Sequence, residues 1–194
     1  SMNTMTEDGL RSFQQLVTEA LSEEKIKGII ITSGKVDFSG GMDLSTLEAL
    51  KRNSGSDPAS KIFDYIMEAH GLLRKIELGR IDDTSKSKPV AFAGSGICAG
   101  IGTEIGLACH RRFLSSSKNS KIGLPEIIVG LFPGLGGTTR VPRMMGLMGA
   151  SSVLLEGKLF TSNKAKSIGL VDEVVSEDEL IQKAKDWVLS ASPQ

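Results

Sequence analysis

The sequence has few of the residues from which metal sites, disulfide frameworks and catalytic triads are built: 194 residues include only 2 Cys and 2 His. Cys98 and Cys109 fit no CxxC or Cys/His spacing, so we expect neither a metal site nor a disulfide framework. Unpaired cysteines are typical of a reducing compartment, which predicts a cytoplasmic location. His70 and His110 have no Ser and Asp at triad spacing. We predict both as helix residues, His110 as a C-terminal cap.

Net charge is also lacking. Lys+Arg and Asp+Glu are both 23, and the formal net charge at pH 7 is +0. Without a long-range field the chain as a whole is not drawn to nucleic acid or to an anionic membrane, so we predict neither as a partner.

Long apolar runs are scarce as well, and one segment only imitates a membrane span. Residues 90–109 contain a single charge, Glu104. A lone carboxylate at bilayer depth is costly, and the five glycines of the segment disfavour one continuous helix. The segment therefore predicts a buried strand, a glycine turn and a buried helix, with no membrane span.

The length and the hydrophobic pattern predict one α/β domain over residues 1–194. A chain of this size buries roughly 70% of its unfolded surface. Ser1-Met2 is typical of the scar that a purification tag leaves. The predicted helices span 7–22, with Thr6 as N-cap, 43–50, 62–76, 100–110, 135–148, 162–167 and 180–188, and the predicted strands span 28–33, 89–93, 112–115 and 170–175. This alternation favours a largely parallel sheet.

Three segments carry more specific predictions. In the predicted strand at 28–33, apolar and polar residues do not alternate, which predicts a fully buried strand in a sheet that is covered on both faces. The polar stretch 51–60 predicts a mobile loop, and 121–129 predicts extended chain interrupted by Pro125.

The glycines at 94–99 allow two interpretations. Gly94-Ser95-Gly96-Ile97-Cys98-Ala99 fits the dinucleotide fingerprint GxGxxA, but serines stand at 115–117, where that fingerprint needs an acidic residue. Alternatively, Ile101 and Gly102 open a helix, and their backbone N–H groups could stabilise an oxyanion. Gly40-Gly41, before Met42 and Asp43, could supply an opposing N–H. For either glycine pair alone, a simple tight turn is the competing interpretation.

Two carboxylates interrupt apolar segments. Glu104 lies in the first turn of a helix of small apolar residues, and Glu126 follows Pro125 within Ile122–Val129. Burial raises the proton affinity of a carboxylate, which suits general acid/base catalysis near neutral pH. The helix dipole could instead stabilise Glu104. A salt bridge to Arg140 or Arg143 could hold Glu126.

These residues together resemble a known family. The motifs are GICAGIGTE at 96–104, IGLPEIIVGLFPGLGGTTRVPR at 122–143, FSGGMD at 38–43 and AKSIGLVDEVV at 165–175. They resemble the enoyl-CoA hydratase/isomerase (crotonase) superfamily over nearly the whole chain. The stretch at 122–143 is most similar to the hydratase domain of the bacterial fatty-acid-oxidation multifunctional enzyme.

The resemblance implies a spiral of βαβ units with C-terminal helices, usually assembled as trimers. It implies that the N–H groups of Met42 and Ile101 hold the thioester oxygen of an acyl-CoA substrate. Glu104 and Glu126 would then add water across the 2,3 double bond of a trans-2-enoyl-CoA in fatty-acid beta-oxidation, with no cofactor besides the substrate. The substrate-binding residues that it implies are Gly41, Asp43, Gly100, Gly102, Pro133 and Gly134.

The sequence departs from the family at three points. Ile101 stands where glycine is usual, and its side chain is expected to narrow the site. Residues 3–6 resemble the segment after the family's first two strands, so the domain is expected to lack those strands. Nothing in the chain corresponds to the dehydrogenase domain of the multifunctional enzyme, which we expect in a longer protein with a thiolase partner. The alternatives to a hydratase are an enoyl-CoA delta-isomerase and a non-catalytic acyl-CoA-binding module.

Overall fold

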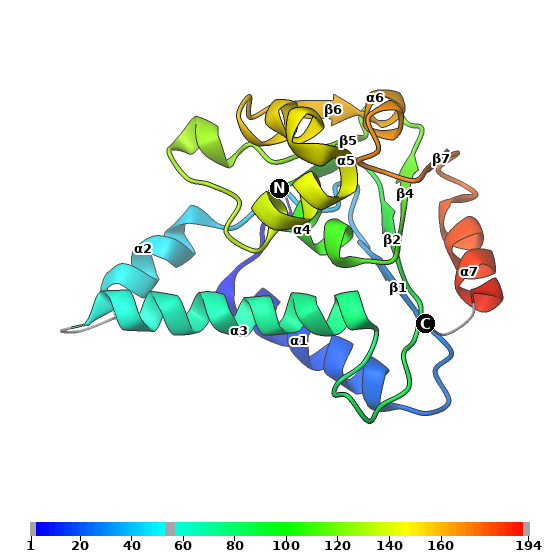
Figure 1. Ribbon diagram of the computed structural model, residues 1–194, viewed down its shortest axis with the longest axis horizontal. Helices are drawn as coiled ribbons and strands as arrows, with labels where there is room; N and C mark the ends of the chain where they lie inside the picture. The colour runs from blue at the N-terminus through cyan, green and yellow to red at the C-terminus, as the bar shows by residue number, and fades with distance from the viewer. Residues whose placement is uncertain (1–2, 53–56, 192–194) are drawn as a thin grey trace.

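The protein folds into two small sheets enclosed by helices, as the computed structural model shows for residues 3–52 and 57–191 (Figure 1). The larger sheet is fully parallel, in the order β1-β2-β4-β7. Its strands are β1 (Ile29–Thr32), β2 (Val90–Gly94), β4 (Arg111–Ser115) and β7 (Glu173–Val175). The smaller sheet joins β3 (Ile97–Ala99), β5 (Lys121–Gly123) and β6 (Leu159–Thr161), with only β5 and β6 antiparallel. The predicted α/β class with a largely parallel sheet is confirmed.

The helices follow the predicted order, except that η1 was not predicted. They are α1 (Glu7–Ser22), α2 (Leu44–Arg52), α3 (Pro58–Leu78), α4 (Ile101–Ala108), the 3-10 helix η1 (Glu126–Val129), α5 (Gly137–Leu154), α6 (Ser162–Ser167) and α7 (Leu180–Ser190). Thr6 caps α1, as predicted, by accepting a hydrogen bond from the Gly9 N–H. Crossovers β1–α3–β2 and β2–α4–β4, followed by C-terminal helices, confirm the expected succession of βαβ units.

Helices cover both faces of the larger sheet, which explains its apolar central strand. On one face, Ala184 and Val188 of α7 pack against Ala91 and Ala93. On the other, α4 packs against the fully buried Phe92 at Gly106, and α3 packs on α4. All five residues of β2 are therefore buried. None of the helices within 3–52 and 57–191 is long and apolar enough to cross a membrane, and 90–109 forms β2, β3 and α4.

Three predictions are wrong in part. β1 is not fully buried, because it is an edge strand: Ile29 and Ile30 are half-buried and Thr32 is exposed. Most of the described residues of the predicted loop at 51–60 belong to helices, since 51–52 end α2 and 58–60 begin α3. Residues 53–56 lie outside the described residues, as does the predicted tag scar at 1–2. The predicted glycine turn before α4 contains a short strand, β3.

The prediction of extended chain over 121–129 holds only to Gly123. Pro125, at φ −85° and ψ 9°, turns the chain into η1, and Gly130 ends η1 in the left-handed region at φ 73°. The result is a tight turn that places Glu126 at its start.

His110 is also placed differently from the prediction, because α4 ends at Ala108 and His110 does not cap it. Its Nδ1 accepts a hydrogen bond from the Val90 N–H at 2.9 Å, so Nε2 carries the proton that faces the Glu77 carbonyl at 3.1 Å. His110 thus joins the end of α3 to the start of β2. Burial lowers its pKa and favours the neutral ring.

Candidate active site

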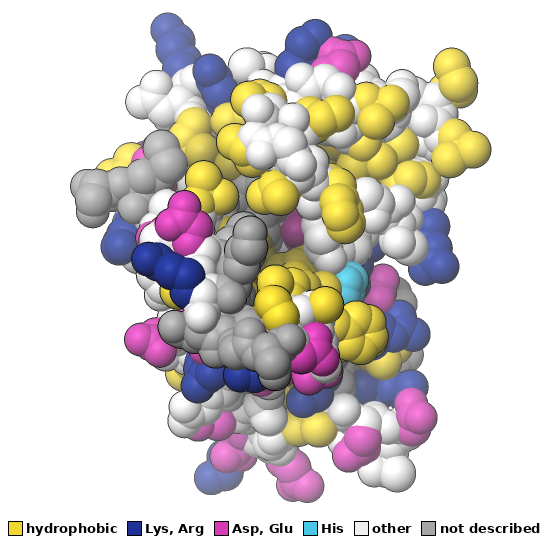
Figure 2. All heavy atoms as spheres, turned by 90° about the vertical axis from the view of Figure 1, so that its left-hand side faces the viewer, with side chains coloured by type: hydrophobic (Ala, Val, Ile, Leu, Met, Phe, Trp, Pro, Cys, Tyr) yellow, Lys and Arg dark blue, Asp and Glu magenta, His cyan; other side chains and the backbone are white. Residues whose placement is uncertain are grey.

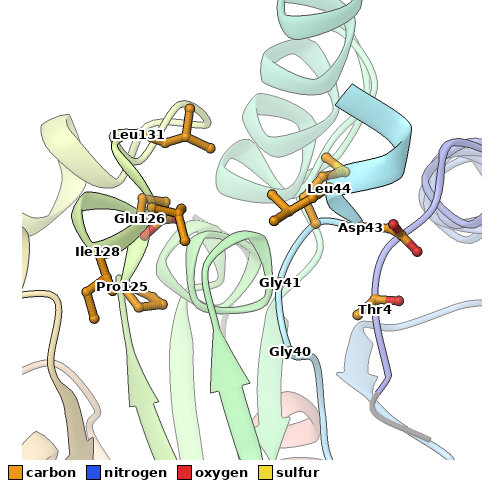
Figure 3. A pocket seen from close by; sticks show the side chains of 11 residues that line it. Thr4, Gly40, Gly41, Asp43, Leu44, Pro125, Glu126, Ile128 and Leu131 are labelled. Carbon is orange, nitrogen blue, oxygen red and sulfur yellow. The ribbon is translucent and has the colours of Figure 1, made fainter. Parts of the chain in front are cut away.

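A cavity of about 520 Å³ opens between the loop at 40–44 and the segment at 125–131 (Figure 3). Apolar side chains predominate in its wall, which consists of Thr4, Gly40, Gly41, Met42, Asp43, Leu44, Pro125, Glu126, Ile128, Val129 and Leu131. The two segments face each other, and the Asp43 carboxylate points away from the gap between them. A concave apolar site with few polar groups is typical of a small-molecule pocket.

The loop that carries Met42 is braced by residues 3–5. The Gly40 N–H donates to the Asn3 carbonyl at 2.6 Å, and the Met5 N–H donates to the Gly41 carbonyl at 2.9 Å. Gly41 adopts φ 107°, a conformation that favours glycine. The Met42 N–H donates to no other group among the described residues, so it is available to a ligand oxygen at the cavity wall.

Asp43 has a local structural role. Its Oδ1 accepts hydrogen bonds from the backbone N–H and the hydroxyl of Ser45, which lower its pKa. These hydrogen bonds hold the Asp43 carboxylate at the start of α2. A direct contact of Asp43 with substrate stays a prediction.

The start of α4 lies next to both the Met42 loop and Glu126. Gly100, at φ 57°, donates its N–H to the Gly123 carbonyl, which leaves the Ile101 N–H as the first unpartnered donor of the helix within the described chain. A Cβ on Gly100 would lie 3.3 Å from Glu126 Oε1 and 3.4 Å from Gly41 Cα. Gly100 thus lies where the Glu126 carboxyl, the Met42 loop and the start of α4 come together.

Two expectations about the start of α4 change. The Ile101 side chain is only 4% exposed and packs in the core, so it does not narrow the cavity as expected. A Cβ on Gly102 would lie 2.6 Å from Ser39 Cβ, so Gly102 allows α4 to pack closely on the Met42 loop. Neither residue belongs to the cavity wall.

Glu104 is 2% exposed, and a neighbouring loop holds it. Its Oε1 accepts hydrogen bonds from the backbone N–H groups of Leu135, at 2.8 Å, and Gly137, at 2.9 Å. Burial raises the pKa of Glu104 to about 7, with a further rise from the charge of Glu126. The two N–H groups and Arg140 oppose this rise. The carboxyl can therefore exchange a proton near neutral pH.

Glu126 has no comparable restraint. Its Oε2 is buried without a hydrogen-bond partner among the described residues, and burial raises its pKa. The alternative of a salt bridge to Arg140 or Arg143 is wrong: Arg140 pairs with Glu77 at 3.4 Å, and Arg143 forms no ion pair with any described residue. Glu126 is the carboxyl that the cavity wall presents.

Pro133 and Gly134 lie in the loop between η1 and α5, outside the cavity wall. A Cβ on Gly137 would lie 2.9 Å from Pro133 Cβ, so Pro133 shapes the loop that holds Glu104. Contact of Pro133 or Gly134 with substrate stays a prediction.

The sequence prediction missed the apolar wall and the loop donors. Leu44, Ile128, Val129 and Leu131 line the cavity. The apolar run from Ile127 to Phe132 was an available signal, because it directly follows Glu126, a candidate catalytic carboxyl. Its large apolar side chains are exposed in the structure. Among the residues that the structure describes, no group of three or more His, Cys, Asp or Glu could hold a metal ion.

Comparison with known proteins identifies the same family as the sequence motifs, over nearly the whole chain. The family model described as enoyl-CoA hydratase/isomerase matches residues 1–191. The chain is 34% identical over 190 residues to the glyoxysomal fatty acid beta-oxidation multifunctional protein MFP-a of Cucumis sativus, covering 97% of the chain and 24% of that protein. It is 35% identical over 193 residues to the fatty acid oxidation complex subunit alpha of Shewanella loihica, covering 99% of the chain and 26% of that protein. The chain thus spans about a quarter of the length of these relatives.

Solved structures match in the same way. An enoyl-CoA hydratase from Thermoplasma volcanium superimposes with a TM-score of 0.81 at 26% identity, covering 97% of this chain and 69% of that one. An enoyl-CoA hydratase from Bacillus anthracis superimposes with a TM-score of 0.78 at 27% identity, covering 96% and 66%.

Proposed function

Because this chain belongs to the enoyl-CoA hydratase/isomerase family, we propose that it hydrates trans-2-enoyl-CoA thioesters to 3-hydroxyacyl-CoA in fatty-acid beta-oxidation. The observation that carries the proposal is that the Glu126 carboxyl and the Met42 loop come together at Gly100, beside the unpartnered Ile101 N–H, and that the charge of Glu126 acts on the buried carboxyl of Glu104. The coenzyme A thioester is itself the substrate, and we propose no further cofactor.

In this mechanism the N–H groups of Met42 and Ile101 bind the thioester oxygen. Attack at C3 moves negative charge through C2 onto that oxygen, and donors placed beforehand stabilise it most in the transition state. The helix dipole of α4 adds to this effect at Ile101.

Glu104 and Glu126 transfer the protons. The water oxygen bonds to C3, its proton goes to the ionised carboxylate of the pair, and the protonated carboxyl delivers a proton to C2. Burial raises the pKa of both carboxyls, and the charge of Glu126 raises the pKa of Glu104 further, to about 7. In the proposed reactive state the pair carries one proton, which Glu104 can hold near neutral pH. This state contains the base and the acid that hydration needs.

The setting of this activity is also a proposal. The names of the relatives, a multifunctional protein and a complex subunit, support a domain of a larger fatty-acid-oxidation protein. We propose that this protein also carries a 3-hydroxyacyl-CoA dehydrogenase domain and binds a thiolase partner. We further propose a homo-oligomer, such as a trimer, in the cytoplasm. Two buried cysteine thiols without a disulfide are compatible with a reducing compartment.

The test offers the protein crotonyl-CoA and, separately, a cis-3-enoyl-CoA, and follows the loss of each. We expect hydration of crotonyl-CoA, and a loss of kcat of about 10²-fold or more in each of Glu104→Gln and Glu126→Gln. Glu173→Gln, which alters a partly exposed carboxylate paired with Arg111, serves as the control and should keep full activity. Undiminished hydration in both active-site variants excludes the mechanism. Conversion of the cis-3 substrate alone favours the isomerase, and tight acyl-CoA binding without turnover favours the binding module.

A further inference from the structure

A buried arginine lies directly behind the loop that holds Glu104. The Arg140 side chain is 11% exposed, and its Nη1 donates to the Leu135 carbonyl at 3.0 Å. The same Leu135 donates its N–H to Glu104 Oε1. One residue of the loop therefore connects the arginine to the carboxylate.

The other side of the guanidinium reaches α3. Arg140 Nη2 lies 3.4 Å from Glu77 Oε2, and Glu77 also pairs with Arg74 at 2.7 Å. The backbone carbonyl of Glu77 faces the His110 ring, which ties the end of α3 to β2. Arg140 thus connects the loop to the end of α3, which His110 in turn connects to β2.

Gly136 makes room for this arrangement. It adopts φ 99°, and a Cβ there would lie 2.3 Å from Arg140 Nη1. The guanidinium consequently packs against the backbone of the loop between Leu135 and Gly137. Those two residues are the donors to Glu104.

We propose that Arg140 is a positioning residue for Glu104: by joining the loop at 135–137 to Glu77, it fixes the two N–H groups that orient the Glu104 carboxylate. Arg140 acts through the loop, and its hydrogen bonds go to Leu135 and Glu77. The inference rests on the proposed function, because it concerns a carboxyl of the proposed catalytic pair.

The charges around Glu104 give the direction of the effect. Glu126 of η1 disfavours ionisation of Glu104, and Arg140 of α5 favours it. Glu77 of α3 is paired with Arg140, and Arg112 of β4 is paired with Asp172. Removal of the Arg140 charge therefore raises the pKa of Glu104, and release of the loop raises it further by loosening the two N–H donors.

The experiment titrates the Glu104 carboxyl directly by carbon-13 NMR of glutamate labelled at the carboxyl carbon, assigned with Glu104→Gln. In Arg140→Met the titration midpoint should move to higher pH, and both limbs of the kcat profile should move with it. We expect kcat to fall about tenfold and KM to change less than about twofold, because the cavity wall is untouched. Arg140→Lys keeps the charge and should return the midpoint toward the wild-type value.

Arg112→Met is the matched control. Arg112 is 12% exposed and ion-paired, so its loss should disturb the fold comparably while the Glu104 midpoint stays in place. If Arg140→Met does not fold, Arg140→Gln provides the same measurement, because it also removes the charge that pairs with Glu77. A wild-type midpoint in folded Arg140→Met or Arg140→Gln overturns the inference. A shifted midpoint in a protein that hydrates no enoyl-CoA supports the inference and refutes the proposed function.

Discussion

The two candidate catalytic carboxyls lie in regions of opposite character. All eight residues of α4, including Glu104, are buried, whereas no residue of η1, including Glu126, is fully buried. The backbone N–H groups of Leu135 and Gly137 donate to Glu104, whereas Glu126 Oε2 has no hydrogen-bond partner among the described residues. The proposed site therefore combines a carboxyl held by two loop N–H groups with one that has an unpartnered oxygen.

The surface reflects the same difference. Figure 2 shows hydrophobic side chains gathered over the upper part of one face, where η1 and α5 lie. Ile128 is 70% exposed and Phe132 73% exposed. Exposed apolar groups of this kind are typical of surfaces that bind a ligand or a partner.

The strongest test of the comparison asks whether the two regions act as one catalytic unit. We expect the double variant Glu104→Gln/Glu126→Gln to lose about as much kcat as the poorer single variant, on the order of 10²- to 10³-fold, since neither carboxyl completes the reaction alone. Steady-state hydration of crotonyl-CoA measures all three variants. Multiplied losses would mean that the carboxyls contribute independently.

A second test compares a leucine of the buried core with a leucine of the cavity wall. Leu124 is 0% exposed and packs in the core, so Leu124→Ala should lower the free energy of unfolding by about 3 kcal/mol. Leu131 is 44% exposed on the cavity wall, so Leu131→Ala should change stability by less than about 0.5 kcal/mol and raise KM instead. Urea denaturation and steady-state kinetics check the pair. Equal loss of stability in both variants would contradict the contrast.

A third test uses pH. Burial raises the pKa of Glu104 in the folded protein from 4.5 to about 7, so the unfolded chain releases this proton first, and stability falls as pH rises through that interval. Glu104→Gln cannot ionise, and its amide oxygen can still accept both N–H groups. The variant should match the wild type near pH 4 and exceed its stability by up to about 3 kcal/mol at pH 8.

The matched variant Glu126→Gln should gain less over the same range, because Glu126 as a whole is only half-buried, whereas Glu104 is 2% exposed. Urea denaturation at a series of pH values measures both. A constant difference between Glu104→Gln and wild type across this range would show that Glu104 titrates like an exposed carboxyl.

The buried region was also the more predictable one. Periodicity and glycine spacing predicted β2 and α4 because their residues are selected by burial, which leaves a strong pattern. The segment after Gly123 was mispredicted as extended, since its apolar run is typical of a buried strand, whereas Ile127, Ile128 and Val129 are exposed in η1. There Pro125 and Gly130 determine the turn, and the hydrophobic pattern does not reveal it.

The site shows the same limit. Glu104 and Glu126 were recognised because carboxylates in apolar segments are conspicuous. The donors to Glu104 could not be predicted, because they are backbone groups of a loop 31 and 33 positions away along the chain. The pairing of Arg140 with Glu77, 63 positions apart, likewise depends on tertiary structure.

The parallel register of the larger sheet has a consequence for folding kinetics. The contacts between β1 and β2, and between β4 and the chain at β7, join residues about 60 positions apart. Such contacts form only after a long loop has closed, whereas α1 and α3 depend on local contacts. We therefore expect the helices to form early and the sheet late. Because β7 pairs with β4, a nascent chain completes this sheet only after synthesis has passed Val175.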